Sequence, residues 1–193
     1  VGLREVARIE AEMDRVLREL GRREGTVQAR MVALRQELQP PAQPDPRPMI
    51  LARYTEAVRD AATRAQALFN LQPAAPVEVR RVPALTEGTA SAYYTQPAPD
   101  GSRPGIFWAP LPGPDYDMLR IRSLAVHEAV PGHHFQLALQ QEQRDLPRWR
   151  QRRIFGGGSA HSEGWGLYAE RLALDHGWYD GDPHALLGGL DGQ

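Results

Sequence analysis

A proline inside an otherwise helical segment is the feature that most restricts how this 193-residue chain can fold. The segment reads LAVHEAVPGHHFQLAL over residues 124–139. Pro131 lacks a backbone N–H and its ring collides with the preceding turn, so a straight helix cannot pass through it. Gly132 follows directly and accepts backbone angles that other residues avoid. We therefore predict a kink, or a break and restart, in the helix at Pro131.

The same segment begins as a zinc-protease helix does. In the HExxH pattern two histidines one turn apart bind the metal, with a glutamate between them. His127 and Glu128 match its beginning, but Pro131 takes the place of the second histidine. On an ideal helix His133 would point away from His127, and His134 would return to the same face about 10 Å further along. A bend would bring one of the two back, and we favour His133 because a glycine precedes it.

A second run, SAHSEGWGLYAERLAL, contains a candidate third ligand. Glu163 and Glu170 are seven positions apart and therefore share one helical face. Ser162 can cap the start of this helix, and Gly164 and Gly166 leave room for another backbone. In zinc peptidases of the thermolysin class the third ligand is a glutamate from a separate downstream helix, which favours Glu163. The alternative is that both glutamates are ordinary surface residues.

These residues suit one Zn²⁺ ion, because a hydrolytic site needs about three protein ligands and an open position for water. The chain has no cysteine, so the ligands are limited to His, Asp and Glu. The candidates are His127, His133, His134 and Glu163, with Glu128 as general base for the metal-bound water. Two alternatives stay open: surface histidines beside a helix break, or an Fe(II) or Mn(II) site. A glutamate directly after the first histidine favours hydrolysis over redox chemistry.

The rest of the chain predicts an α+β fold that is mostly α-helical. Apolar residues recur every three or four positions before Gly21, and weaker stripes follow around residues 31–38 and 50–68. Later segments such as VEVRRVPAL, SAYYTQ and GIFWAP carry β-branched and aromatic residues between turns. We predict one region over 1–193, helical in 1–75, with a small antiparallel sheet in 76–118 and metal-site helices, joined at FGGGSA, in 119–193.

Charge and hydropathy exclude several classes of partner. The chain has 23 basic and 24 acidic side chains and a net charge of −1, so we expect no nucleic-acid partner. No apolar run approaches the roughly 18–20 residues of a membrane span. The chain starts at a valine already in helical rhythm, and PHALLGGLDGQ at its end resembles an unfinished helix. We expect a piece of a larger protein, with cytoplasmic and exported locations both open and the oligomeric state undetermined.

Two residues upstream of the histidines are candidates for substrate binding. Arg103 lies in the turn PDGSRPG and can pair with a carboxylate, and Tyr94 lies in the preceding aromatic segment. The strand GIFW would present its edge to an extended peptide. A tight turn beside core aromatic residues is an equally good reading of the same positions.

Three blocks of the chain resemble a bacterial family known as domain of unknown function 885, which is regarded as a family of zinc metallopeptidases. The blocks are YYTQPAPDGSRPGIFW (93–108), LAVHEAVPGHHFQ (124–136) and SEGWGLYAERLA (162–173), in the order and approximate spacing of the family. The resemblance implies a fold similar to gluzincin metallopeptidases. It also implies zinc ligation by His127, one of the 133/134 histidines and Glu163, with Glu128 as base.

Two functions follow as expectations. The first is a zinc-dependent peptidase or amide hydrolase that acts on a peptide or small amide. The second is a non-catalytic fragment that binds metal or a partner through an exposed half-cleft, because family members are several hundred residues long and continue past the EGW helix.

Overall fold

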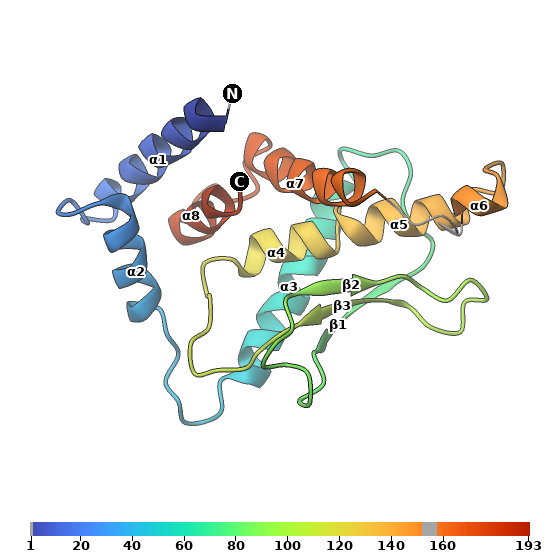
Figure 1. Ribbon diagram of the computed structural model, residues 1–193, viewed down its shortest axis with the longest axis horizontal. Helices are drawn as coiled ribbons and strands as arrows, with labels where there is room; N and C mark the ends of the chain where they lie inside the picture. Colours follow the sequence, from blue (N-terminus) through green and yellow to red (C-terminus); the bar gives the residue numbers. More distant parts are fainter. Residues whose placement is uncertain (1, 152–157) are drawn as a thin grey trace.

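The computed structural model describes residues 2–151 and 158–193, and Figure 1 shows the arrangement of its elements. The predicted joint at FGGGSA falls largely outside these residues. The helices are α1 (Gly2–Glu19), α2 (Val27–Glu37), α3 (Arg47–Ala65), α4 (Ile121–Glu128), α5 (His133–Glu142), α6 (Arg148–Gln151), α7 (Ser159–Asp175) and α8 (Pro183–Asp191). The strands are β1 (Val77–Arg81), β2 (Tyr93–Thr95) and β3 (Gly105–Ala109). The α+β class, mostly helical, is confirmed; the likeness to gluzincins stays a prediction.

Local sequence signals explain where the first three helices begin and end. Helix α1 ends just before Gly21, whose φ of 80° is a conformation that favours glycine. Thr26 caps α2 by accepting a hydrogen bond from the Ala29 N–H. Pro48 lies in the first turn of α3, where its missing N–H costs nothing. The predicted stripe over 50–68 overshoots, because α3 ends at Ala65.

The sheet is mixed, whereas the sequence predicted an antiparallel one. Its strand order is β1-β3-β2, with β1 parallel and β2 antiparallel to β3. The most apolar strand, β3, takes the central position, where Ile106 and Phe107 are buried. Both edges of β3 are therefore occupied. The expectation that the GIFW strand offers an edge to a peptide is wrong, because β1 and β2 pair with it on either side.

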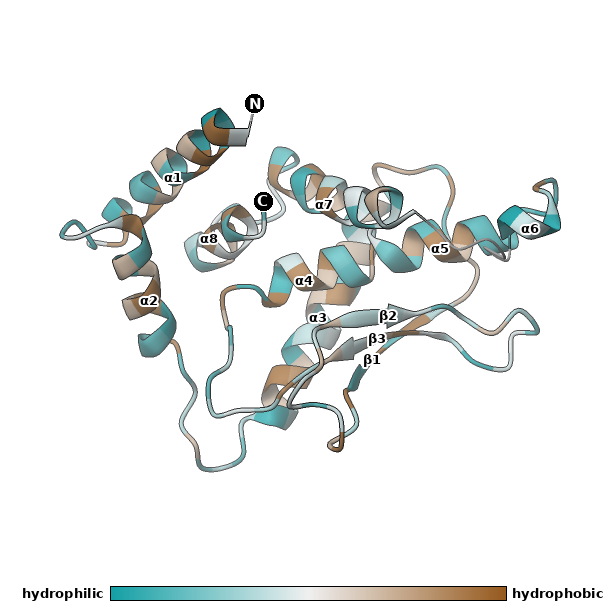
Figure 2. Ribbon diagram, in the orientation of Figure 1, coloured by the Kyte–Doolittle hydropathy of each residue, from teal (hydrophilic) through white to brown (hydrophobic). Residues whose placement is uncertain are grey.

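Helix α4 lies at the centre of the structure and contacts α3, α5, α7 and α8 (Figure 1). Its side chains Ala125 and Val126 are buried, and so is Ala129 just beyond its end. Small residues at these positions allow neighbouring helices to approach closely. Helix α1, by contrast, alternates hydrophobic and hydrophilic bands along its length, as expected for a helix with one buried face (Figure 2). None of the described helices is both long and apolar enough to cross a membrane.

The predicted interruption at Pro131 is a full break between two helices. Helix α4 ends at Glu128 and α5 starts at His133, with a cis peptide bond between Val130 and Pro131. The backbone folds back tightly here: a Cβ atom on Gly132 would lie 1.8 Å from the carbonyl oxygen of His127. Only a residue without a side chain fits this position. The break thereby brings the start of α5 against the last turn of α4.

Gly132→Ala should consequently destabilise the protein by more than about 2 kcal/mol, because the backbone around the break must move to admit the methyl group. Urea unfolding followed by circular dichroism measures the change. Gly88→Ala is the matched control, since a Cβ atom there meets nothing within 4 Å. Equal stability of both variants would contradict the close approach at Gly132.

Candidate metal centre

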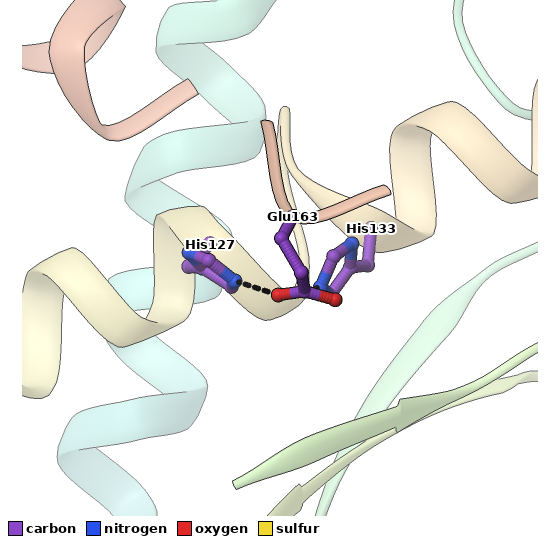
Figure 3. Close-up of side chains that lie close together, drawn as sticks. All are labelled: His127, His133 and Glu163. Atoms are coloured by element: carbon purple, nitrogen blue, oxygen red, sulfur yellow. Dashed lines mark ion pairs between the residues drawn. The ribbon is translucent and has the colours of Figure 1, made fainter. Parts of the chain in front are cut away.

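Three of the predicted ligands converge at the break. His127 comes from the end of α4, His133 from the start of α5, and Glu163 from the first half of α7 (Figure 3). The Nε2 atom of His127 lies 3.4 Å from Oε2 of Glu163, and the Nε2 atom of His133 lies 3.7 Å from the same oxygen. The candidate ligand atoms all lie within 4.8 Å of one another. The two helices that flank the break and the later helix α7 thus contribute to one cluster.

The donor set and spacing of this cluster fit a zinc ion. Zinc binds nitrogen and oxygen ligands at about 2.0–2.2 Å in tetrahedral geometry, which separates neighbouring ligand atoms by about 3.4 Å. The distances from Glu163 to the two histidines are close to this value. Two imidazoles and one carboxylate leave the fourth position for water or substrate. The Glu163 side chain is 57% exposed, so this side of the cluster is accessible from solvent.

A buried carboxylate behind the cluster fixes the orientation of His127. Its Nδ1 atom lies 2.7 Å from Oε1 of Glu170, which is only 1% exposed. The Nδ1–H donates to this carboxylate, and the lone pair of Nε2 then faces Glu163. Burial by itself lowers the pKa of His127, but the hydrogen bond and charge of Glu170, together with the charge of Glu128, raise it above its usual value. The surroundings of His127 therefore favour a positive charge.

Close packing also positions this imidazole. A Cβ atom on Gly166 would lie 2.6–2.9 Å from three atoms of the His127 ring, so α7 packs directly on the ring face. The close approach expected at both glycines of this helix is found at Gly166 but not at Gly164, where a Cβ atom would meet nothing within 4 Å. Trp165 makes the neighbouring contact, because its Nε1–H donates to the Pro131 carbonyl at 2.7 Å. Helix α7 is thus joined both to the ligand and to the break.

The predicted cap of this helix is wrong. Helix α7 begins at Ser159, with Gly158 at the N-cap position, so Ser162 lies inside the first turn. Neither serine of this run is the N-cap residue, because Ser159 is the first residue of the helix and Gly158 precedes it without a side-chain cap.

Glu128 is buried next to the cluster, with 5% of its surface exposed. Its Oε2 atom has no hydrogen-bond partner among the described residues. Burial raises the pKa of this carboxyl to about 7, against the opposing effect of His127. A buried carboxylate without a partner is costly, so this oxygen is suited to a ligand, water or proton that arrives at the site.

The two adjacent histidines, His133 and His134, lie in different surroundings. The ring of His133 packs edge-on against that of His127, with centroids 4.8 Å apart. His134 lies away from the cluster, because its Nδ1 atom is 2.8 Å from the hydroxyl of Tyr94. Burial lowers the pKa of His134 to about 4, a shift that a backbone hydrogen bond with Ala75 opposes. His134 is therefore a neutral residue of the interior at neutral pH.

The two predicted substrate-binding residues lie elsewhere. Tyr94 is half-buried, and its hydroxyl is occupied by His134, which makes it part of the support between β2 and α5. Arg103 lies before β3 and donates to the carbonyl of Pro104 at 3.1 Å. It lines an open groove with Gln141 and Arg148, which none of the three cluster residues lines. The structure does not bring either residue to the candidate metal centre.

A cavity of about 340 Å³ adjoins the centre on the side of α3. Both His127 and Glu128 line it. A substrate that reached Glu128 would therefore have space next to the catalytic candidate.

Sequence reasoning missed one important residue of this site, Glu170. The shared helical face of Glu163 and Glu170 predicts only a ligand or a surface role for each of them. The sequence does contain a distinguishing signal: Glu170 lies between Ala169 and Ala173, two small apolar residues one helical turn apart, and the structure buries both. Small apolar neighbours at this spacing are typical of a helix face that packs against another helix.

The chain matches the model of a family described as "Bacterial protein of unknown function (DUF885)" over residues 1–193. It is similar to the crystal structure of a "putative lipoprotein" from Colwellia psychrerythraea, with a TM-score of 0.90 and 36% sequence identity over 98% of this chain and 33% of that one. It is also similar in fold to a "putative lipoprotein of unknown function" from Shewanella oneidensis, with a TM-score of 0.66 and 19% identity over 95% of this chain and 35% of that one. No curated protein matches the chain. The chain thus spans about a third of the length of these solved relatives.

The packing of α7 on His127 leads to a testable expectation. Gly166→Ala should weaken Zn²⁺ binding by about tenfold or more, because the new methyl group must displace the His127 ring. Gly164→Ala on the same helix should leave metal affinity unchanged and stabilise α7 by up to about 1 kcal/mol. Competition with a zinc-sensitive dye measures both. Equal affinities for the two variants would show that the ring position does not matter for binding.

Proposed function

This chain belongs to the bacterial family of unknown function DUF885, and on that basis we propose that it carries the centre of a zinc-dependent hydrolase acting on peptides or related amides. The observation that supports the proposal most strongly is the convergence of His127, His133 and Glu163 beside a buried Glu128. Two imidazoles and a carboxylate, with a further carboxylate close by, are the donor set of a hydrolytic zinc site.

In this proposal each residue has a separate task. His127, His133 and Glu163 hold the ion, and when bound, zinc supplies a Lewis acid that polarises a carbonyl and acidifies water. Glu170 keeps His127 in the tautomer that leaves Nε2 free. His134 forms a hydrogen bond with the hydroxyl of Tyr94 inside the protein and is not a ligand in this proposal.

Glu128 is the candidate general base. It accepts a proton from the attacking water and returns it to the leaving amine when the carbon–nitrogen bond breaks. Its burial excludes bulk water from this oxygen, and its place in the wall of the cavity gives it access to a bound amide.

Metal content tests the ligand set directly. We expect about one zinc ion per chain in the purified protein after removal of loosely bound metal, and a loss of most of it in His133→Ala and in Glu163→Ala. His134→Gln should keep zinc, because His134 faces Tyr94. Glu10→Ala, at an exposed site on α1, controls for the loss of a carboxylate. Elemental analysis that finds no zinc in the wild-type protein at its natural length would contradict the proposal.

Glu128→Gln separates binding from catalysis. The amide is similar in size to the carboxylate but cannot accept the proton, so hydrolysis should fall by about 10²- to 10⁴-fold while zinc content is retained. Initial rates on a mixture of peptides, read by mass spectrometry, together with elemental analysis of the same sample, measure both quantities. Zinc binding in wild type without any hydrolysis would instead favour the non-catalytic, metal-binding alternative.

A further inference from the structure

Behind His127, the second oxygen of Glu170 faces an arginine. Oε1 of Glu170 accepts the Nδ1–H of His127, whereas Oε2 is buried without a hydrogen-bond partner in the described part of the chain. Glu170 is 1% exposed, so its negative charge lies in the interior. A buried carboxylate is costly unless an opposite charge lies nearby. The cation on the side of Oε2 is Arg120, the N-cap residue of α4.

Gly192, the C-cap residue of α8, shows how close these two side chains are. A Cβ atom added to Gly192 would collide with Oε2 of Glu170 and would lie 3.2 Å from Nη2 of Arg120. Both side chains thus border the Cα atom of this glycine, and a larger residue there would displace them. Their charges attract each other across a short distance in an interior that screens charge weakly.

Helix α8 also fixes the backbone of Arg120. A Cβ atom added to Gly188 would collide with the carbonyl oxygen of Leu119 and would lie 3.1 Å from the backbone nitrogen of Arg120. The hydroxyl of Ser123 donates to the carbonyl of Gly188 at 3.3 Å, which joins the two helices once more. The glycines of α8 therefore allow the start of α4 to pack closely against it, with Arg120 directed toward Glu170.

The acidic residue closest to Arg120 in the sequence has other partners. Oδ1 of Asp117 accepts hydrogen bonds from the backbone N–H groups of Leu119 and Arg120, and its Oδ2 lies 3.4 Å from Nε of Arg35. Its carboxylate is therefore occupied by the start of α4 and by α2. The interior carboxylate that shares the contact at Gly192 with the guanidinium is Glu170.

Arg120 acts on the candidate base as well. Burial is the main effect that raises the pKa of Glu128, and the charge of Arg120 is one of the smaller effects that lower it. The guanidinium thus lies between two acidic residues of the centre, one that holds His127 and one that is the candidate base.

We propose that Arg120 is a positioning residue of the candidate metal centre: its charge holds Glu170 in place, and Glu170 in turn holds the His127 imidazole with Nε2 directed at the ion. The proposal rests on the proposed function, because it concerns the affinity of the same centre for zinc. A ligand whose orientation is fixed before the metal arrives loses less freedom on binding. Arg120 acts through Glu170 and is not itself a ligand.

Zinc affinity tests this role through the sign of the effect. A cation near the centre repels Zn²⁺, so loss of that repulsion alone would make Arg120→Gln bind zinc more tightly. Loss of positioning has the opposite effect, and we expect Arg120→Gln to bind zinc about tenfold or more weakly. Competition with a zinc-sensitive dye, on the protein at its natural length, measures the affinity. Unchanged or tighter binding by a folded Arg120→Gln variant would overturn the proposal.

A double-mutant cycle shows whether Arg120 acts through Glu170. The variant with both Arg120→Gln and Glu170→Gln should bind zinc as Glu170→Gln alone does, within about twofold, because the charge on which Arg120 acts is already gone. Losses that simply add would overturn the proposal. Arg30→Gln is the matched control, since Arg30 is also buried but pairs with Asp14 in the contact between α1 and α2. It should lower stability and leave zinc affinity unchanged.

The zinc-free protein provides a second readout. With ¹⁵N-labelled histidine, the Nδ1–H of His127 should give an NMR signal that exchanges slowly with solvent, because it donates to a buried carboxylate. In Arg120→Gln this proton should exchange about tenfold or more faster, whereas Arg30→Gln should leave it unchanged. Equal exchange in wild type and Arg120→Gln would overturn the proposal. A wild-type protein that binds no zinc would contradict the proposed function, and this measurement would still decide whether Arg120 positions His127.

Gly192→Ala tests the same contact if Arg120→Gln does not fold, as judged by circular dichroism. The new methyl group must displace Oε2 of Glu170, so zinc binding should weaken by about tenfold while every charge is retained. Gly164→Ala is its control, because a Cβ atom there meets nothing within 4 Å. Equal zinc affinity of these two variants would overturn the proposal.

Discussion

The packing of α7 against the break between α4 and α5 is the constraint on which the candidate centre depends. The break places His133 against His127, and α7 then closes over it through the Trp165 bond to Pro131 and the contact of Gly166 with the imidazole. Without the break the two histidines would point in different directions on one helix. Without α7 neither Glu163 nor the support for His127 would be present.

Burial distinguishes two glutamates that are equivalent in the sequence. Glu163 and Glu170 lie two turns apart on the same face of α7 and both reach the imidazole of His127, one at each ring nitrogen. The exposed carboxylate can exchange its contacts for a cation, whereas the buried one holds the ring. A single helix thus contributes both a candidate ligand and the residue that orients another ligand.

In the proposed function, the cavity next to Glu128 is the space available to a substrate. Its walls come from α3, α4 and the loop after β3, which are the elements that surround the ends of the central helix. The chain corresponds to about a third of its solved relatives, both of which carry descriptions without an assigned activity. The proposed ligands and the proposed base thus lie together within about a third of the length of these solved proteins.

The sequence by itself determined the helical segments, the interruption at Pro131 and the small set of candidate metal ligands. These are consequences of local physics: proline removes a donor, apolar spacing selects a helix, and His and Glu are the available ligands. Only the tertiary structure decided that β1 runs parallel to β3, that Tyr94 engages His134, and that Glu170 holds His127. Each of these depends on contacts between segments far apart in the chain, and residue spacing alone carries no information about which of them meet.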